Sequence, residues 1–326
     1  MSEVTDGSRG ERLEDALIVC TRNRPLEVGR CLESVANQTR LPHVILVVDS
    51  SDDDATERVV GGRSFGPLAD RLEYHRSLAG LTHQRNAGVA LTRSDIVHFI
   101  DDDVVLEPGY IAAVMAAFSA DERGAILGVG GLVTNAHHEG RSSLRRLFGL
   151  YGDRSGAVLA SGRNVLAVDL VVDADVDWLS GCSMSYRRTL FDVIRFDEDL
   201  PGYGLGEDVE FSYRVRQHGR LLVATAARLV HLQSPTNRLT SVQYTRDELI
   251  TRARRVRART GRLRMRAFWL SVIGQVVGLL AASLGRPDRR LSLRRCMATV
   301  RTALAIAVES ISRRPQLDPT TLVRRP

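Results

Sequence analysis

Short apolar runs alternate with longer segments of helical spacing along the first 120 residues. The runs that predict buried strands lie at 16–20, 44–49, 72–75 and 96–101. The segments whose apolar residues would share one face of a helix lie at 26–35, 81–91 and 111–118. This alternation predicts an α/β fold, in which a mostly parallel sheet carries helices on its faces.

The predicted strands end in carboxylates. Asp49 closes the second strand, and Asp101, Asp102 and Asp103 close the fourth. Ligands of open α/β sheets bind beyond the carboxyl ends of the strands. Three adjacent carboxylates are unfavourable without a cation, and hard cations such as Mg²⁺ or Mn²⁺ prefer oxygen ligands. Because Asp101 and Asp103 are second neighbours, they would point the same way on an extended segment. We therefore expect a metal–diphosphate site here; a solvated acidic turn is the alternative.

A glycine and two acids mark the second half of the chain. Residues 135–165 are rich in Gly, Ser, Arg and His and predict loops. The following strand-like segment, 176–187, is interrupted by Gly181, and such a glycine often marks the close approach of a ligand or another backbone. Glu207 and Asp208 then lie at the start of a predicted helix, 209–218. They either cap it favourably or supply a general base.

The last apolar runs, 221–224 and 229–232, end near His231. A lone histidine at a strand end is more often structural than a ligand. Neutral imidazole nevertheless binds Mn²⁺-like ions beside carboxylates, so both interpretations stay open on the residues alone.

Composition adds a strong asymmetry of charge. The chain has 326 residues, which suggests one or two domains, and all 45 of its basic residues are arginine. A single arginine is therefore a weak signal here. The net charge of +6 divides unevenly: residues 245–326 hold 19 Arg and 5 acids, or +14, and the rest holds 26 Arg and 34 acids, or −8. A basic tail on an acidic body favours an anionic partner.

The tail also contains an uncharged apolar segment at 267–284, at the lower limit for crossing a membrane. Arginines flank it on both sides and give no orientation. A helix in the membrane interface and a soluble helical hairpin with the amphipathic segment 296–311 are alternatives, so spanning stays open. The arginines that could attract anionic headgroups are Arg252, Arg254, Arg255, Arg257 and Arg259. Without a nucleic-acid motif, we expect a membrane surface and no nucleic acid as partner.

The remaining features set the domain limits. The four cysteines are scattered, which indicates a reducing compartment. Residues 1–14 are polar, lack a signal-peptide pattern and are expected to be disordered. We expect a catalytic domain at 15–240 and a basic helical region at 241–326. The oligomeric state is not predicted.

Seven segments, in order, resemble family 2 glycosyltransferases with the A-type nucleotide-sugar-binding fold. They are 17–25, 47–56, 80–88, 99–103, 179–187, Gly206-Glu207-Asp208 and 229–231. The resemblance covers roughly residues 15–232 and implies inverting transfer of a sugar from a UDP-, GDP- or dTDP-sugar to a hydroxyl. It implies Mn²⁺ or Mg²⁺ as cofactor, and it makes a metal-ligand role for His231 the favoured interpretation.

The resemblance also implies roles for individual residues. Asp208 would be the catalytic base, and Asp101, Asp103 and His231 the metal ligands. The residues that would bind the nucleotide-sugar are Thr21, Asn23, Asp49, Arg85, Asp101 and Asp102, with Asp49 on the base. The residues that would shape the acceptor side are Trp178, Gly181 and Glu207, with Glu207 on acceptor hydroxyls.

Two departures qualify the resemblance. Ser50 and Ser51 replace the usual Asp-Gly after the second strand, and no Gln-x-x-Arg-Trp motif follows Asp208, which argues against a processive synthase. The acceptor would be a cell-surface or lipid-linked glycan, handled at the cytoplasmic face of a bacterial membrane. The alternatives are a catalytically silent nucleotide-sugar-binding scaffold and a nucleotidyltransferase, although residues 21–25 lack the glycines of a nucleotidyltransferase phosphate loop. The sugar, nucleotide and linkage are left open.

Overall fold

A computed structural model describes residues 13–62, 65–137, 142–200, 204–236, 239–258, 263–285 and 289–312. The expected disorder of the first residues and the lipid-facing role of Arg259 therefore lie outside the described residues. The strands are β1 Asp15–Thr21, β2 Val44–Asp49, β3 Leu72–Arg76, β4 Ile96–Asp101, β5 Val104–Leu106, β6 Ile126–Val133, β7 Ala174–Val176, β8 Ser183–Arg187 and β9 Arg220–His231. The α-helices are α1 Pro25–Ala36, α2 Ala55–Gly62, α3 Leu81–Ala90, α4 Tyr110–Ser119, α5 Ser143–Leu147, α6 Glu207–Val215, α7 Ser241–Arg257, α8 Met265–Gly285 and α9 Arg289–Ser312. Two 3₁₀ turns lie at Gly66–Leu68 and Arg188–Asp192.

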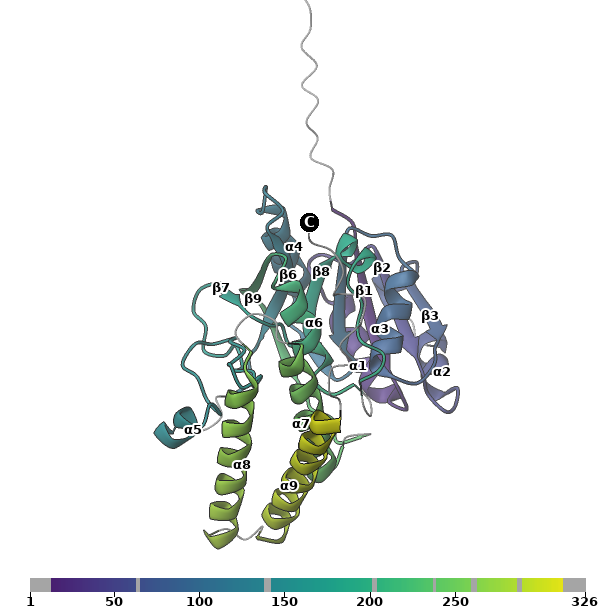
Figure 1. The fold of residues 1–326 in the computed structure, drawn as a ribbon. Coiled ribbons are helices and arrows are strands. Elements are labelled where there is room, and N and C mark those ends of the chain that lie inside the picture. Colours follow the sequence, from purple (N-terminus) through teal and green to yellow (C-terminus); the bar gives the residue numbers. More distant parts are fainter. Residues whose placement is uncertain are drawn as a thin grey trace, which may run out of the picture.

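The strands form one mixed sheet in the order β3-β2-β1-β4-β8-β6-β9-β5, with β7 paired to β9 (Figure 1). The first four strands of this order pair in parallel, and β8 joins β4 antiparallel. This confirms the predicted α/β fold. Parallel pairing brings the carboxyl ends of β1, β2 and β4 to one edge, which is where their polar side chains collect.

Alternate residues of the central strands fill two hydrophobic layers. On one face Leu17 and Val19 pack with α1 and α4, and on the other Ile18 packs with α3 and α6. Successive side chains of a strand point to opposite faces, so a strand buried on both sides shows a continuous apolar run. This is why the first strands could be predicted from their runs.

Two predicted elements differ from the structure. The apolar runs 221–224 and 229–232 belong to one strand, β9, which pairs with β6 and changes register between Ala224 and Arg228. The helix predicted from residue 209 begins at Glu207, because both acids lie in its first turn.

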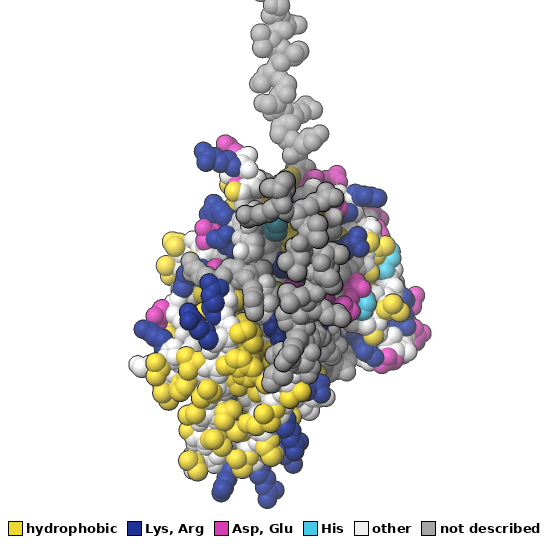
Figure 2. All heavy atoms as spheres, viewed as in Figure 1, with side chains coloured by type: hydrophobic (Ala, Val, Ile, Leu, Met, Phe, Trp, Pro, Cys, Tyr) yellow, Lys and Arg dark blue, Asp and Glu magenta, His cyan; other side chains and the backbone are white. Residues whose placement is uncertain are grey.

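The C-terminal helices pack on the sheet domain through α7. Side chains of α7 and α8, among them Leu249 and Phe268, share a buried cluster with Trp178 and Val209 of the sheet domain. This cluster crosses the predicted boundary between residues 240 and 241, which stays a prediction. Figure 1 shows α8 and α9 extending away from the sheet as a hairpin, and Figure 2 shows hydrophobic side chains gathered on it.

Two arginines of α7 are not where the sequence suggested. Arg252 and Arg255 are buried, with 1% and 7% of their surfaces exposed. They are therefore not part of the outer surface of α7 that could lie against a bilayer. Arg254 and Arg257 keep 40% and 25% of their side chains exposed and remain candidates.

Candidate functional site

A cavity of about 530 Å³ opens at the carboxyl edge of the sheet. Its lining residues are Cys20, Thr21, Arg22, Asn23, Arg24, Ser50, Asp52, Gly80, Leu81, Gln84, Asp101, Asp102, Asp103 and His231. They come from the ends of β1, β2, β4 and β9 and from the start of α3. The sheet edge at which we expected the strand-end carboxylates to collect therefore forms a wall of this cavity.

Three candidate metal ligands converge in this cavity. One ligand atom each of Asp101, Asp103 and His231 lies within 4.8 Å of the others. Asp101 ends β4, and the antiparallel pairing of β5 with β9 sets Val104 opposite His231, which brings the imidazole beside Asp103. His231 Nε2 lies 3.0 Å from Asp103 Oδ1. Two carboxylates and an imidazole are a donor set that fits Mn²⁺ or Mg²⁺.

The ion pair changes the protonation of both partners. Burial opposes the ionisation of Asp103, but the hydrogen bond and charge of His231, together with the Ser234 N–H, lower its pKa to about 2. Burial alone would lower the pKa of His231, yet the hydrogen bond to Asp103 raises it to about 10. Metal binding would therefore displace a proton from His231.

Asp102 lines the same cavity and is held by Thr21 at the end of β1 and by Arg24 in the loop that follows. Its carboxylate accepts hydrogen bonds from Thr21 Oγ1 at 2.7 Å and from Arg24 NH1 at 2.9 Å. Burial raises the pKa of Asp102 to about 7 despite the charge of Arg24. The same guanidinium group lies 3.7 Å from Asp103, so Arg24 is a cation at the centre of the acidic group. Sequence reasoning missed Arg24, because arginine supplies every basic residue of the chain.

Asn23 and Asp49 stabilise the loops of the cavity. Asn23 Nδ2 donates to Asp52 at 2.7 Å, and Asn23 Oδ1 accepts from the Asp52 N–H at 2.8 Å, which ties the loop after β1 to the loop after β2. Asp49 is fully buried, and its oxygens accept from Ser51 and from the Tyr74 hydroxyl. Its carboxylate does not line the cavity, so the expected contact of Asp49 with a nucleotide base stays a prediction.

Arg85 connects the acidic cluster to the start of α6. It is 2% exposed, forms a short ion pair with Glu207, and lies 3.4 Å from Asp101. Its NH2 also donates to the carbonyl of Gly181 at 3.1 Å. A methyl group at position 181 would lie 3.0 Å from Glu207 Oε1 and 3.1 Å from Arg85 NH2, which explains why glycine interrupts the strand pattern here.

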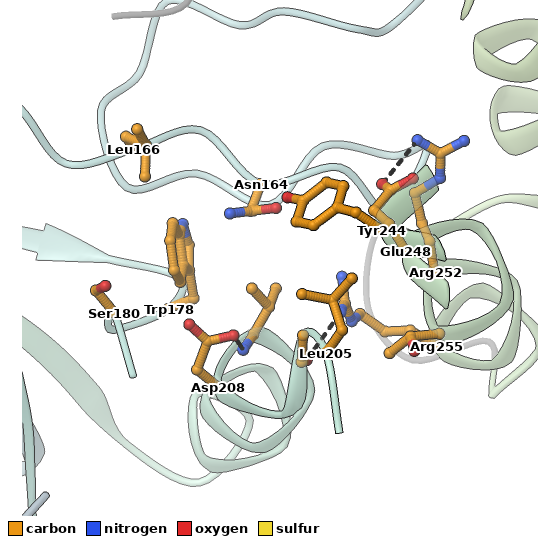
Figure 3. Close-up of a pocket in the computed structure, with 13 residues that line it drawn as sticks. Asn164, Leu166, Trp178, Ser180, Leu205, Asp208, Tyr244, Glu248, Arg252 and Arg255 are labelled. Atoms are coloured by element: carbon orange, nitrogen blue, oxygen red, sulfur yellow. Dashed lines mark hydrogen bonds and ion pairs between the residues drawn. The ribbon is translucent and has the colours of Figure 1, made fainter. Parts of the chain in front are cut away.

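A second cavity, of about 230 Å³, lies beside Asp208 (Figure 3). Asp208 accepts from the backbone N–H groups of Gly181 at 3.0 Å and Val209 at 2.7 Å. The indole of Trp178 also lines this cavity, and its Nε1 donates to the Val165 carbonyl at 2.9 Å. The Asp208 carboxylate thus borders a space beside the Trp178 indole, and a hydroxyl bound there within hydrogen-bond reach could be deprotonated by it.

Burial controls the protonation of the two acids of α6. It raises the pKa of Asp208 above its usual range, although the Gly181 and Val209 N–H groups oppose the shift. Burial and the neighbouring Asp208 raise the pKa of Glu207 to about 7, against the charge of Arg85. Glu207 is buried on Arg85 and does not line the second cavity, so its expected contact with acceptor hydroxyls stays a prediction.

The chain is similar to known glycosyltransferases in sequence. Residues 16–165 match the family model of glycosyl transferase family 2. The validoxylamine A glucosyltransferase of Streptomyces hygroscopicus subsp. limoneus is 29% identical over 227 residues, which are 63% of this chain and 48% of that protein. The hyaluronan synthase of Pasteurella multocida is 21% identical over 240 residues, or 68% of this chain and 24% of the synthase. The chain spans about half or less of the length of these curated relatives.

Solved structures share the fold at low identity. One is the mannosyltransferase PcManGT from Pyrobaculum calidifontis in complex with GDP-Man and Mn²⁺, with a TM-score of 0.57 and 15% identity over 92% of this chain and 88% of that one. Another is GalNAc-T7 with UDP, GalNAc and Mn²⁺, with a TM-score of 0.53 and 14% identity over 94% of this chain and 59% of that one. These structures show that the chain has the A-type fold, and the sequence of residues 16–165 is similar to glycosyl transferase family 2.

Proposed function

We propose that the protein transfers a sugar from a nucleotide-sugar, of the UDP, GDP or dTDP type, to a hydroxyl of an acceptor. The observation that carries this proposal is the convergence of Asp101, Asp103 and His231 in one cavity, joined through buried Arg85 to the Glu207–Asp208 pair. The GDP-Man and UDP of the two solved structures support a nucleotide-sugar donor.

The chain's own residues supply the positions for an inverting single displacement. Asp208 takes the proton of the acceptor hydroxyl as that oxygen attacks the anomeric carbon, and the bond to the nucleoside diphosphate breaks on the opposite side. Arg24 supplies positive charge beside the expected diphosphate. Asp101, Asp103 and His231 would hold the divalent cation, which when bound neutralises charge on the departing diphosphate.

The test compares the chain with its Asp208→Asn variant in two assays. Transfer, or slow hydrolysis of the nucleotide-sugar, should fall by about 10²–10⁴-fold when the base is lost. Nucleotide binding should persist, because Asp208 lies outside the first cavity. Full activity of Asp208→Asn would remove the proposed base. A wild-type chain that binds nucleotide-sugar but neither transfers nor hydrolyses it would favour a silent scaffold.

We further propose that the hairpin of α8 and α9 lies on a membrane. Within the described residues, Met265–Leu284 is long and apolar enough to cross one, and 28% of its apolar window is buried in the protein. The exposed apolar side chains that recur along α8 at intervals of three and four are Leu270, Ile273, Val277, Leu280 and Leu284. The corresponding stripe of α9 is Leu293, Met297, Val300, Leu304 and Val308. Ile273 and Leu304 border one groove that has only apolar lining residues.

Arginines favour a position in the interface over spanning. Arg294 and Arg301 are exposed on α9, and an arginine at the centre of a bilayer costs about 2.5 to 3.5 kcal/mol on insertion scales. On the surface of the bilayer the same arginines would reach the headgroups. A second groove lies between α7 and α9, and its lining residues include three more arginines that could reach the headgroups, Arg246, Arg254 and Arg257. This arrangement supports an acceptor that is a cell-surface or lipid-linked glycan.

A further inference from the structure

The cavity that holds Asp208 has a cationic end. Arg252 and Arg255 lie three residues apart on α7, so they share one face of the helix, and both line this cavity. Figure 3 shows Trp178 and Asp208 at one end, and Tyr244, Arg252 and Arg255 toward the other. A ligand with its hydroxyl at Asp208 would therefore extend toward the arginines.

Several polar atoms at this end have no hydrogen-bond partner in the described structure. They are Nε and NH2 of Arg252, Nε of Arg255 and Oγ1 of Thr251. Arg252 and Thr251 are each 1% exposed and Arg255 is 7% exposed. Burying donors without acceptors is costly, so such atoms call for a ligand that satisfies them.

The two arginines and the two carboxylates that line this cavity are unevenly placed. Glu248 is the lining carboxylate at the cationic end, and it is shared between Arg252, at 3.2 Å, and Arg163, at 3.4 Å. Arg255 donates to the carbonyls of Gly162 and Gly206. The second lining carboxylate, Asp208, lies toward the other end beside Trp178. A phosphate between Arg252 and Arg255 would accept charge-assisted hydrogen bonds from both guanidinium groups.

We propose that this end of the cavity is a subsite for a phosphate group carried by the acceptor. The proposal rests on the proposed function, because it assigns the acceptor of that same site. The acceptor hydroxyl lies at Asp208, its sugar ring lies against Trp178, and its phosphate lies between Arg252 and Arg255. The donor diphosphate is a different group, because neither arginine lines the cavity of Asp101 and Asp103.

An adjoining cavity of about 300 Å³ extends this subsite toward the hairpin. It shares Tyr244 and Glu248 with the cavity beside Asp208 and adds Arg295 of α9. The phosphate could belong to a water-soluble glycosyl phosphate or join a glycan to a lipid. Both sources present non-bridging phosphate oxygens to Arg252 and Arg255, although the glycosyl phosphate is a monoester with up to two negative charges and the lipid-linked phosphate is a diester with one.

The test measures phosphate binding by the fluorescence of Trp178. The chain has two tryptophans, so Trp269→Phe leaves Trp178 as the single reporter. Inorganic phosphate is titrated at constant ionic strength, once with EDTA and once with saturating nucleotide and Mn²⁺, which occupy the donor cavity. We expect saturable binding under both conditions. Equilibrium dialysis of labelled phosphate with the unsubstituted chain repeats the measurement without any variant.

Substitutions locate the bound phosphate. Arg252→Gln and Arg255→Gln should each weaken it at least tenfold, and Arg255→Lys should weaken it less. Arg254→Gln is the matched control on the same helix, because Arg254 does not line the cavity, and it should leave binding within twofold of the parent. Absence of saturable binding in the unsubstituted chain would overturn the proposal. Equal binding by folded Arg252→Gln, Arg255→Gln and Arg254→Gln would overturn it as well.

Two further arms separate the remaining questions. The first arm measures Mn²⁺-dependent nucleotide binding by the unsubstituted chain and by the same variants. A chain that binds phosphate but no nucleotide would count against the proposed function and not against the phosphate subsite. A glycosyl phosphate in water is then compared with a long-chain ester, in which the same glycosyl phosphate is joined to a long alkyl chain, in detergent micelles. Tighter binding of the long-chain ester identifies a lipid-linked acceptor, and equal binding identifies a soluble one; both outcomes support the subsite.

Discussion

Arg85 is the residue that couples the two acidic groups of the site. Its guanidinium group pairs with Glu207 of α6 and with Asp101 of β4, and it is almost completely buried. Removing one partner of a buried ion pair leaves the other charge unpaired, which costs about 3 to 5 kcal/mol. The Arg85 side chain also passes over the rings of Phe99 and Phe196. Arg85 therefore stabilises the fold and positions the candidate ligands.

Arg85→Met should lower the free energy of unfolding by about 3 to 5 kcal/mol at pH 8 and by less at pH 5. The sign follows from Glu207, whose pKa in the folded chain is raised to about 7. At pH 5 Glu207 is protonated in the parent and in the variant, so it needs no cation beside it. At pH 8 the variant either buries an unpaired Glu207 carboxylate or keeps that group protonated against the solution pH, and both cost free energy. Urea unfolding at both pH values measures this.

Arg214→Met is the control, because Arg214 forms a partly exposed pair with Glu210 on α6. Its cost should be at most about 1 kcal/mol and nearly independent of pH over this range. An Arg85→Met loss as large at pH 5 as at pH 8 would contradict the assigned role of Glu207.

The pH dependence of transfer tests Asp208 as the base. Only the ionised carboxylate accepts a proton, and burial raises the pKa of Asp208. The rate should therefore rise with pH through an apparent pKa above the usual value of about 4. A kcat/KM profile between pH 4 and 8 shows this limb. A profile that is flat down to pH 4 would exclude Asp208 as the group that limits the reaction.

The sequence predicted some residues of the site and not others, for physical reasons. The positions of Asp101 and Asp103 could be predicted because both follow a buried strand at the carboxyl edge of the sheet. His231 on its own residues was as consistent with a structural role, and the family resemblance is what favoured it; the structure brings all three together, and their role as metal ligands stays a prediction. Arg24 could not be predicted, because one arginine among 45 carries little information. The burial of Arg252 was missed for the same reason.

At the scale of elements, α7 joins the C-terminal helices to the sheet domain. Thr240 caps it: its Oγ1 accepts from the Gln243 N–H, and Gln243 Oε1 accepts from the Thr240 N–H. Leu249 of the same helix is fully buried against the sheet domain. The composition of the sequence therefore changes near residue 240, but one hydrophobic cluster contains residues from both sides of that position.

Leu249→Ala should lower the free energy of unfolding by about 2 to 5 kcal/mol, because it leaves a cavity between α7 and the sheet domain. Leu270→Ala on α8 is the control; Leu270 is 42% exposed and should cost about 0.5 kcal/mol or less. Chemical denaturation followed by circular dichroism measures both. If Leu249→Ala left the main unfolding transition unchanged, the C-terminal helices would fold as a separate unit.

Long-range pairing explains which strands were hard to predict. The runs of β1, β2 and β4 are visible locally because both faces of each strand are buried. In β9 the apolar pattern is broken at residues 225–228, yet β6 continues to pair with it across the shift of register. That continuity depends on contacts nearly a hundred residues away along the chain, and no local pattern reports them.

At the scale of the whole molecule, the exposed apolar face of the hairpin lies beside arginines of α7 and α9 (Figure 2). We expect the protein to sediment with vesicles that contain anionic lipid and to be released as salt rises, because ions screen the headgroup attraction. The double variant Ile273→Glu/Leu304→Glu should lose binding to these vesicles and keep nucleotide binding.

Val193→Glu is the control for that double variant. Val193 is 81% exposed and lies on the sheet domain, so a carboxylate there should leave vesicle binding unchanged. Vesicle binding by the hairpin variant equal to that of the unsubstituted chain would contradict the proposed membrane face.

The most direct measurement of the central claim is Mn²⁺-dependent binding of UDP, GDP and dTDP to the purified chain, with Asp103→Ala and a control, Asp54→Ala. Asp54 is an exposed acid outside the donor cavity. We predict that one nucleotide binds with Mn²⁺, that EDTA releases it, and that Asp103→Ala weakens it at least tenfold while Asp54→Ala does not. Failure of all three nucleotides to bind, or binding that neither EDTA nor Asp103→Ala affects, would contradict the proposed donor site.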